Sequence, residues 1–500
     1  MLFLKKNIIW IICFLSFFTA LFYNQLNLNK LPDTQKRENT TVITKDDYSY
    51  LNPAETYLKT GEWKQEGNSM QSYFLRPPGY GIFYLFFLKI SNTPLLLLKL
   101  AQILLFSCSV FWLYSILSSI FKHNTFNLTT TALYALTPFF TSFLSYTLTE
   151  GVTPALTLLF VYLLIAATKR EHNQQKNTFY LLAATSFSIL LIIRPPLGFL
   201  GALLPIFIIT DYWKTGLLKT LTKLILFGCV AFSIMGVWQF RNYKLTGSYV
   251  GLHAIYYPDN NSIYRPTFQE YWNFVGGWAQ EGAEAHSYMV PMWKAAIKGD
   301  TSEIYIKNAI ATFPKKVVNH IGTKRLSGVF RQYQEATLHQ KKYYDKNIPM
   351  PLEIPAIEIA CVDSFKAITN EFKKEFWFDS FILAPLKVFK IMSFHSNLSA
   401  YIFQNTYRGN WLIEFLRVLF FGIHSLCFLM LLMSLFCFKT LDWRLTAINI
   451  TVFCYLFYLC YFQRGIEERY TLPILALLLI NLSTVNALVF QKIQLRRNPR

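Results

Sequence analysis

The sequence predicts an all-α protein that crosses a membrane about ten times. Hydrophobic residues make up 53% of its 500 residues and charged residues only 15%, and the chain contains 46 Phe and 30 Tyr. Apolar runs of about 17–25 residues, the length that spans a bilayer as a helix, recur along it. Helices are expected in these runs because, in lipid, every backbone amide needs a partner within its own segment.

The expected spans are joined mostly by short connections. They lie near residues 7–23, 95–120, 127–145, 151–168, 178–194, 197–211, 221–239, 411–438, 445–462 and 471–490. The first follows two lysines and lacks a small-residue cleavage site, which favours an uncleaved first helix over a signal peptide. The apolar run at 80–91 is too short to span, so we expect an aromatic-rich helix lying in the outer leaflet.

The formal net charge of +20 is distributed in a way that indicates topology. Basic residues fall in alternate short loops, which is typical of the cytoplasmic face. With the N-terminus inside, the basic loops at 122–126, 169–177, 212–223 and 439–444 and the C-terminus all lie inside. No nucleic-acid recognition motif accompanies the charge, so the bilayer is the expected partner and nucleic acid is not.

Three regions follow from this topology. Residues 1–239 form a transmembrane core that includes the first outer loop, 24–79, and residues 411–500 form C-terminal transmembrane helices. Between them, 240–410 is long enough for a small outer helical domain. Within it we expect helices at 266–275, 301–333 and 364–392, with an interruption at Pro314, and a proline-containing loop over 340–358.

The polar clusters that carry candidate chemistry all fall at the outer ends of spans. They are Asp46-Asp47, Arg76 to Tyr80, Glu150, Arg241 to Tyr243, and Glu467 to Tyr470. A bilayer would gather them into one layer at its outer surface. Such a layer suits an enzyme whose substrate is a lipid head group.

The first outer loop contains the two most informative clusters. Asp46 and Asp47 precede a segment able to form a helix, so either a helix cap or a general base fits them. Thirty residues after Asp46 comes R-P-P-G-Y, Arg76 to Tyr80, whose prolines stiffen the chain and whose Gly79 permits a close turn. Arg76 is then either a substrate ligand or an arginine anchored at the interface.

Together these motifs resemble the first outer loop of the GT-C glycosyltransferases. The similarity is to bacterial relatives of the protein O-mannosyltransferases and of the aminoarabinose lipid A transferases. The later motifs of the chain occur in the same order as in these families, whereas residues 255–410 resemble no family that we can name. The matching motifs are D-x-x-x-Y-L-x-x-A from Asp46, R-P-P-G-Y, Thr149-Glu150, Arg194-Pro195, W-x-x-R-N-Y-x-x-x-G from Trp238, and R-Y-x-x-P from Arg469.

The resemblance implies a GT-C-like helical bundle with amphipathic outer-loop helices, and an inverting transfer from a polyprenyl-phosphate sugar to a glycan, lipid or protein acceptor. The active site would lie on the outer side of the cytoplasmic membrane. By motif position the catalytic base is Asp46, although many relatives carry Asp-Glu there, so Asp47 stays open as the base. The residues expected at the substrate are Arg76, Tyr80, Glu150, Arg241, Arg469 and Tyr470.

Three questions stay open at this point. No H-x-x-H spacing predicts a metal site, but some GT-C enzymes use a divalent cation. A transporter or flippase of lipid-linked sugars would carry ionisable groups at mid-span and often internal repeats, and neither pattern appears. A non-catalytic subunit of a glycan assembly complex fits the same fold.

The predicted topology has a direct test. Cysteines introduced near residues 40, 300 and 466 should react with a membrane-impermeant thiol reagent added outside the cell, because those segments are expected outside. Cysteines near 172, 216 and 442 should react only after the membrane is opened. Labelling in the opposite sense would place the motif residues in the cytoplasm.

Overall fold

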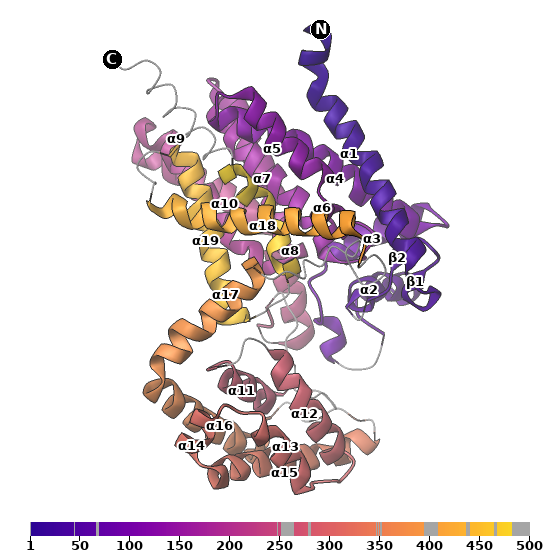
Figure 1. Cartoon of the computed structure of the whole chain (residues 1–500), viewed down its shortest axis with the longest axis vertical. Coiled ribbons are helices and arrows are strands. Elements are labelled where there is room, and N and C mark those ends of the chain that lie inside the picture. Colours follow the sequence, from indigo (N-terminus) through magenta and orange to yellow (C-terminus); the bar gives the residue numbers. More distant parts are fainter. Residues whose placement is uncertain are drawn as a thin grey trace.

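The computed structural model describes residues 2–44, 46–66, 70–247, 249–251, 265–278, 282–346, 348, 350, 353–394, 409–436, 441–464 and 468–482. These residues are almost entirely helical (Figure 1). Their sheet is one antiparallel pair, β1 (Lys36–Arg37) and β2 (Thr41–Val42), with Lys36 opposite Val42. The predicted all-α fold is therefore confirmed.

The membrane part combines both ends of the chain. Its helices are α1 (Leu2–Lys30), α2 (Asp47–Thr60), α3 (Gly79–Ile90), α4 (Pro94–Ile120), α5 (Asn124–Leu136), α6 (Pro138–Thr141), α7 (Thr153–Thr168), α8 (Asn173–Ile193), α9 (Leu203–Tyr212), α10 (Leu217–Thr246), α18 (Trp411–Phe436) and α19 (Trp443–Tyr458).

Among the described residues, seven helical segments are long and apolar enough to cross a membrane, so the chain is a multi-pass membrane protein. They are Asn7–Asn29, Pro94–Ile120, Asn173–Ile193, Pro195–Thr215, Leu217–Thr246, Glu414–Phe436 and Trp443–Gln463. Two further expected spans correspond to the shorter apolar helices Thr153–Thr168 and Arg469–Leu482. The run expected to be too short to span is the separate helix Gly79–Ile90.

The expected span over 127–145 is divided. Helix α5 ends at Leu136, Thr137 is extended (φ −77°, ψ 136°), and Pro138 begins the single turn α6. A residue before proline disfavours the helical region, which explains the break. The irregular segment after α6 then pairs with the first outer loop, where the Val42 amide donates to the Ser145 carbonyl at 2.9 Å.

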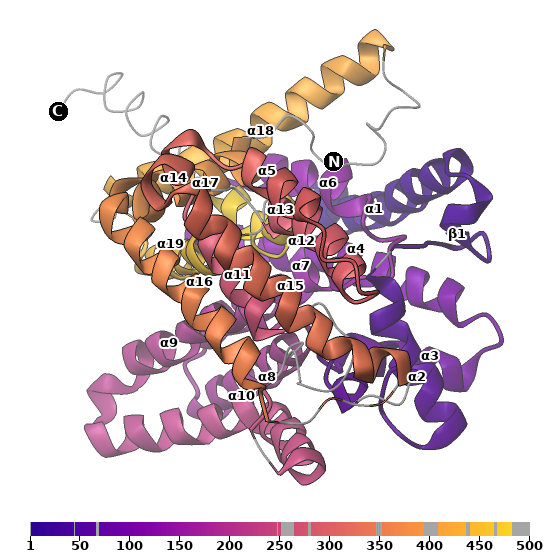
Figure 2. The ribbon, with the colours of Figure 1, turned by 90° about the horizontal axis from the view of Figure 1, so that it is seen from below.

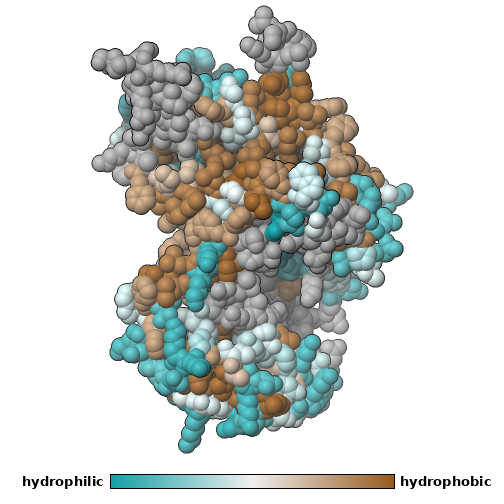
Figure 3. Space-filling model, viewed as in Figure 1, coloured by the Kyte–Doolittle hydropathy of each residue, from teal (hydrophilic) through white to brown (hydrophobic). Residues whose placement is uncertain are grey.

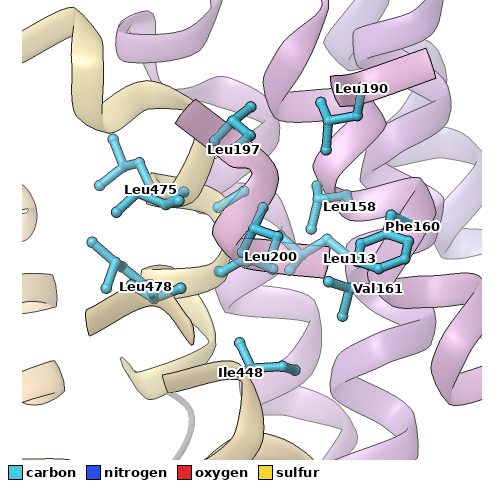
Figure 4. Close-up of a cluster of buried hydrophobic side chains, with 14 of the residues drawn as sticks. Leu113, Leu158, Phe160, Val161, Leu190, Leu197, Leu200, Ile448, Leu475 and Leu478 are labelled. Atoms are coloured by element: carbon cyan, nitrogen blue, oxygen red, sulfur yellow. The ribbon is translucent and has the colours of Figure 1, made fainter. Parts of the chain in front are cut away.

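The core of the membrane part is built where N-terminal and C-terminal helices meet (Figure 4). Leu197 and Leu200 lie on the 3₁₀ helix η4 (Pro195–Ala202) and are completely buried. On one side of them lie Leu158 and Leu190, and on the other lie Leu475 and Leu478 (Figure 4). This packing holds the last described helix against the first half of the chain.

A second group of helices packs around its own core, below the bundle in Figure 1. The group has a more hydrophilic surface than the bundle (Figure 3). Aromatic side chains dominate its core, including Tyr271, Phe330 and Phe365. Its helices are α11 (Pro266–Val275), α12 (Gly282–Ala296), α13 (Glu303–Ala311), α14 (Lys315–Ile321), α15 (Thr323–Lys346) and α16 (Ala356–Glu375), which α17 (Ala384–Phe394) connects to the bundle.

The sequence prediction for this region was partly wrong. The break at Pro314 is confirmed, but the loop expected over 340–358 is helical as far as Lys346. Helix α15 continues because Phe330, Tyr333, Thr337 and Gln340 recur at helical spacing and bury one face.

Helix α18 has an orientation that hydropathy does not reveal. It lies crosswise to α19 in Figure 1 and projects from the side of the molecule in Figure 2. Many of its apolar side chains are exposed, among them Phe415 at 59% and Val418 at 61%. The expected span over 411–438 is therefore a helix, but one that packs little against the bundle.

Gly79 generates a prediction about the fold. A Cβ placed there would lie 2.8 Å from the backbone nitrogen of Ile193, so the start of α3 packs directly on the end of α8. Gly79→Ala should destabilise the protein by about 1–3 kcal/mol through overpacking, measured as a lower melting temperature in detergent.

Gly228 provides the control. It lies within α10 and a Cβ there would meet nothing within 4 Å. Gly228→Ala should leave the melting temperature unchanged or higher. Equal effects of the two substitutions would contradict the close approach of α3 to α8.

Candidate active site

Asp46 stands at the start of α2, but its side chain does not cap that helix. Its carbonyl oxygen instead accepts from the amide and hydroxyl of Ser49, at 3.1 and 2.6 Å. The carboxylate is thereby left to face away from the helix. The capping interpretation offered by the sequence is not what the structure shows.

The Asp46 carboxylate joins two arginines from distant segments. Arg76 donates from Nη2 to Oδ1 at 2.8 Å, and Arg469 donates from Nη2 to Oδ2 at 2.9 Å. Arg76 is further held by the Ser49 hydroxyl at 2.9 Å and lies over the Tyr50 ring at 5.0 Å. The Asp46 side chain is 36% exposed, so this cluster is open to solvent.

Asp47 has a different environment, although it is the next residue. Its side chain is 1% exposed and lies 3.1 Å from Arg37, on strand β1. The Thr147 hydroxyl donates to the same carboxylate oxygen at 3.1 Å. Asp47 therefore ties the hairpin and the segment after α6 to the start of α2.

Glu150 forms a second, buried ion pair. Its Oε1 accepts from Arg194 Nη1 at 2.7 Å, and the same nitrogen donates to the Thr149 hydroxyl at 3.0 Å. Burial acts to raise the pKa of the Glu150 carboxyl, but the guanidinium groups of Arg194 and Arg469 outweigh it and hold the pKa below its usual range. Glu150 is therefore an anion at neutral pH and not a proton donor.

Tyr470 connects the two ion pairs. Arg194 lies over its ring at 5.5 Å and Arg469 at 5.6 Å. Its carbonyl accepts from the Tyr455 hydroxyl at 2.9 Å, which fixes the segment to α19. The structure thus brings Asp46, Arg76, Glu150, Arg469 and Tyr470 into one continuous site.

Two predicted site residues, Arg241 and Tyr80, form their hydrogen bonds with parts of the fold other than the Asp46 cluster. Arg241 donates to the carbonyls of Trp63 and Tyr73, at 2.5 and 3.1 Å, and lies over the Trp238 ring at 4.5 Å. It ties the end of α10 to the first outer loop. Tyr80 is completely buried, and its hydroxyl donates to Gln102 at 2.9 Å. Neither is hydrogen-bonded to the Asp46 carboxylate, whose partners are Arg76 and Arg469. Glu467 lies outside the described residues.

Two arginines of the site were not among the predicted substrate residues. Arg194 had a sequence signal, since it precedes Pro195 at the end of a span and matches a motif of the resemblance. Arg37 had none, because it lies in a polar stretch and acts through a hairpin that no periodicity predicts.

The charges of the site favour an anionic ligand. Four guanidinium groups face three carboxylates, which leaves one positive charge. A divalent cation fits poorly, because each carboxylate is already paired with an arginine that the cation would have to displace. Among the described residues, no three His, Cys, Asp or Glu side chains form a group able to hold a metal ion.

Comparison with known proteins gives structural neighbours of low similarity. No family model matches the chain and no curated sequence is similar to it. Two solved structures of ArnT from Cupriavidus metallidurans align with it. The one bound to undecaprenyl phosphate has a TM-score of 0.36 and 10% identity over 96% of this chain and 77% of that chain. The apo form has a TM-score of 0.37 and 12% identity over 94% and 77%.

The buried ion pair generates a prediction about stability. Glu150→Gln leaves the Arg194 guanidinium buried without its counter-charge, since the Arg194 side chain is only 10% exposed. We expect a loss of about 3–5 kcal/mol, seen as a lower melting temperature at pH 7.

The matched control is Glu303→Gln, which removes a carboxylate from an exposed pair with Arg331. Solvent screens that pair, so the melting temperature should not change measurably. A Glu150→Gln protein as stable as the wild type would show that the Arg194 pair does not hold the site together.

Proposed function

We propose that this protein is a membrane glycosyltransferase of GT-C type. It moves a sugar from a polyprenyl-phosphate donor to a glycan, lipid or protein acceptor at the outer face of the cytoplasmic membrane. The observation that carries the proposal is the open Asp46 carboxylate held between Arg76 and Arg469. In this proposal Asp46 is the base and Arg76 and Arg469 are the phosphate ligands, and the three side chains share one set of hydrogen bonds.

Several features support a lipid phosphate as the ligand. Guanidinium groups bind phosphate oxygens with paired hydrogen bonds, and Arg469 is only 19% exposed, so its contacts are partly desolvated. Arg469 also lies at the start of the apolar helix Arg469–Leu482. A phosphate on a polyprenyl chain can reach it while the chain stays in lipid.

In this proposal Asp46 occupies the place that the donor phosphate takes. The phosphate carries more negative charge than a carboxylate and competes for the same guanidinium hydrogens. When Arg469 and Arg76 turn to the phosphate, Asp46 loses the partners that neutralise it. Donor binding therefore frees the carboxylate for use as a base.

The transfer then needs one displacement at the anomeric carbon. The acceptor hydroxyl oxygen forms the new bond to that carbon, and the bond from the carbon to the phosphate oxygen breaks. The phosphate leaves with the bonding electron pair, stabilised by the arginines. Asp46 accepts the hydroxyl proton, and the configuration of the sugar is inverted.

The test is transfer by the Asp46→Asn variant with a polyprenyl-phosphate sugar as donor. The amide keeps the size of the side chain but cannot accept the proton, so the rate should fall by about 10²–10⁴. The melting temperature should stay close to that of the wild type. The affinity for the donor should not fall, because the amide competes less than the carboxylate for Arg76 and Arg469.

Asp33→Asn is the control, since this exposed aspartate of the same loop pairs only with Lys36 in the described contacts. It should transfer at the wild-type rate. Asp47→Asn should be milder in rate than Asp46→Asn but less stable, because Asp47 is buried against Arg37. Full activity of both Asp46→Asn and Asp47→Asn would place the base elsewhere, and efficient use of a soluble nucleotide sugar would contradict the donor class.

A further inference from the structure

Arg464 ends the last long membrane helix in an unusual conformation. Helix α19 continues as the π-helical turn η10 (Leu459–Gln463), and Arg464 follows with φ 52° and ψ 32°. A left-handed backbone is strained for a non-glycine residue. Such a residue persists only where its surroundings hold it, and these positions gather at functional sites.

The Arg464 guanidinium is held by backbone carbonyls of three separate segments. It donates to Gly276 at the end of α11, to Ser380 at 3.2 Å, and to Tyr461 at 3.3 Å. Gly276 belongs to the second group of helices, α11 to α16, which we call the outer helices. Ser380 lies in the turn that leads from α16 to α17, whereas Arg464 and Tyr461 belong to the membrane part. One side chain therefore connects the two parts.

The sequence explains why the Ser380 carbonyl is available. Ser380 lies in the π-helical turn η6 (Asp379–Leu383), where the Ala384 amide donates to Asp379 and so bypasses Ser380. The next residue, Pro385, has no amide hydrogen to donate. The neighbouring Phe381 carbonyl likewise accepts from a membrane residue, the Tyr461 hydroxyl, at 2.8 Å.

The Gly276 carbonyl is the second acceptor for Arg464, and it too is free of a partner within its helix. It caps the C-terminal end of α11, where carbonyls lack helical partners and the helix dipole favours a cation. The following Gly277 packs so closely on α16 that a Cβ there would lie 3.0 Å from the Phe372 ring. The carbonyl that Arg464 reaches is thus fixed to the core of the outer helices.

Arg464 is close in sequence to a residue of the candidate active site. Arg464 precedes Arg469 by five residues, a distance of at most about 18 Å along the chain. Helix α17, which leads from the outer helices to the bundle (Figure 1), packs against both η10 and η11 (Glu468–Thr471), the turn that carries Arg469. A movement of the outer helices is therefore transmitted to the segment that presents Arg469.

We infer that Arg464 is a positioning residue that locks the outer helices onto the segment bearing Arg469 and so sets Arg469 against Asp46. The inference rests on the proposed function only for the role of Arg469 as a ligand of the donor phosphate. The outer helices then act as part of the transferase machinery, because their placement determines whether the phosphate ligand is in position.

The test combines a distance and an affinity, both measured on the full-length protein in nanodiscs. Spin labels at Thr34→Cys and Lys366→Cys report the separation of the first outer loop from the outer helices, in a background lacking the exposed Cys108, Cys229 and Cys454. Undecaprenyl phosphate is the binding probe. Arg464→Ala should broaden the distance distribution and weaken binding about tenfold.

Arg464→Lys keeps the charge but lacks the planar fork that reaches several carbonyls, so it should recover binding only in part. Arg331→Ala, which removes an exposed arginine of the outer helices, should change neither quantity. Unchanged distances, or unchanged affinity, in Arg464→Ala would overturn the inference. If Arg464→Ala does not fold, wild-type behaviour of Arg464→Lys in both measurements overturns it equally.

These measurements distinguish an error in the proposed donor from an error in the positioning role of Arg464. A wild-type protein that does not bind undecaprenyl phosphate contradicts the proposed donor, and the label distances alone then decide whether Arg464 holds the outer helices. Normal binding by the wild type together with an unaffected Arg464→Ala variant contradicts only the positioning role.

Discussion

The ion pairs of Asp46 are the interaction on which the rest of the site depends. Asp46 and Arg469 are 423 residues apart, and their contact joins the first outer loop to the start of the last described helix. Arg76 joins the same carboxylate from the loop before α3. The leucine core in Figure 4 makes the contact between Asp46 and Arg469 possible, because it packs the C-terminal helix against the first half of the bundle.

Asp46 and Asp47 are adjacent in sequence but differ in environment, one being exposed and the other buried. Successive residues at a helix start point in directions about 100° apart. Asp47 therefore faces the interior, where Arg37 neutralises its charge and Thr147 donates a hydrogen bond to it, while Asp46 faces the open cluster of arginines. A buried, paired carboxylate is costly to disturb and so fixes the backbone. The exposed one can exchange partners with a ligand.

Much of this arrangement could be predicted from sequence. Hydropathy identified most of the long helices, because desolvation of the backbone in lipid leaves few alternatives. The R-P-P-G-Y and R-Y-x-x-P motifs indicated Arg76 and Arg469 through the family resemblance, whereas their position at the ends of apolar spans fitted an interfacial anchor equally well. The span expected over 127–145 missed the helix break at Thr137 and Pro138, because a hydropathy window averages over it.

The remaining features depend on tertiary contacts that carry no local signal. Arg241 looked like a phosphate ligand, yet its guanidinium serves two backbone carbonyls, which only the folded loop brings near. Arg37 acts through a hairpin with two-residue strands. Arg464 binds the Ser380 carbonyl, which a π-helical turn leaves free, and the Gly276 carbonyl at the end of α11. Backbone acceptors are present at every position, so residue identity does not reveal which of them a side chain will find.

We propose that Asp46 holds the place of the donor phosphate, and an experimental structure of the protein with undecaprenyl phosphate bound would test this. Arg469 and Arg76 should then contact the phosphate oxygens, and the Asp46 carboxylate should lie beyond the ~4 Å of an ion pair from Arg469. A phosphate bound elsewhere, with the pair between Asp46 and Arg469 intact, would contradict it.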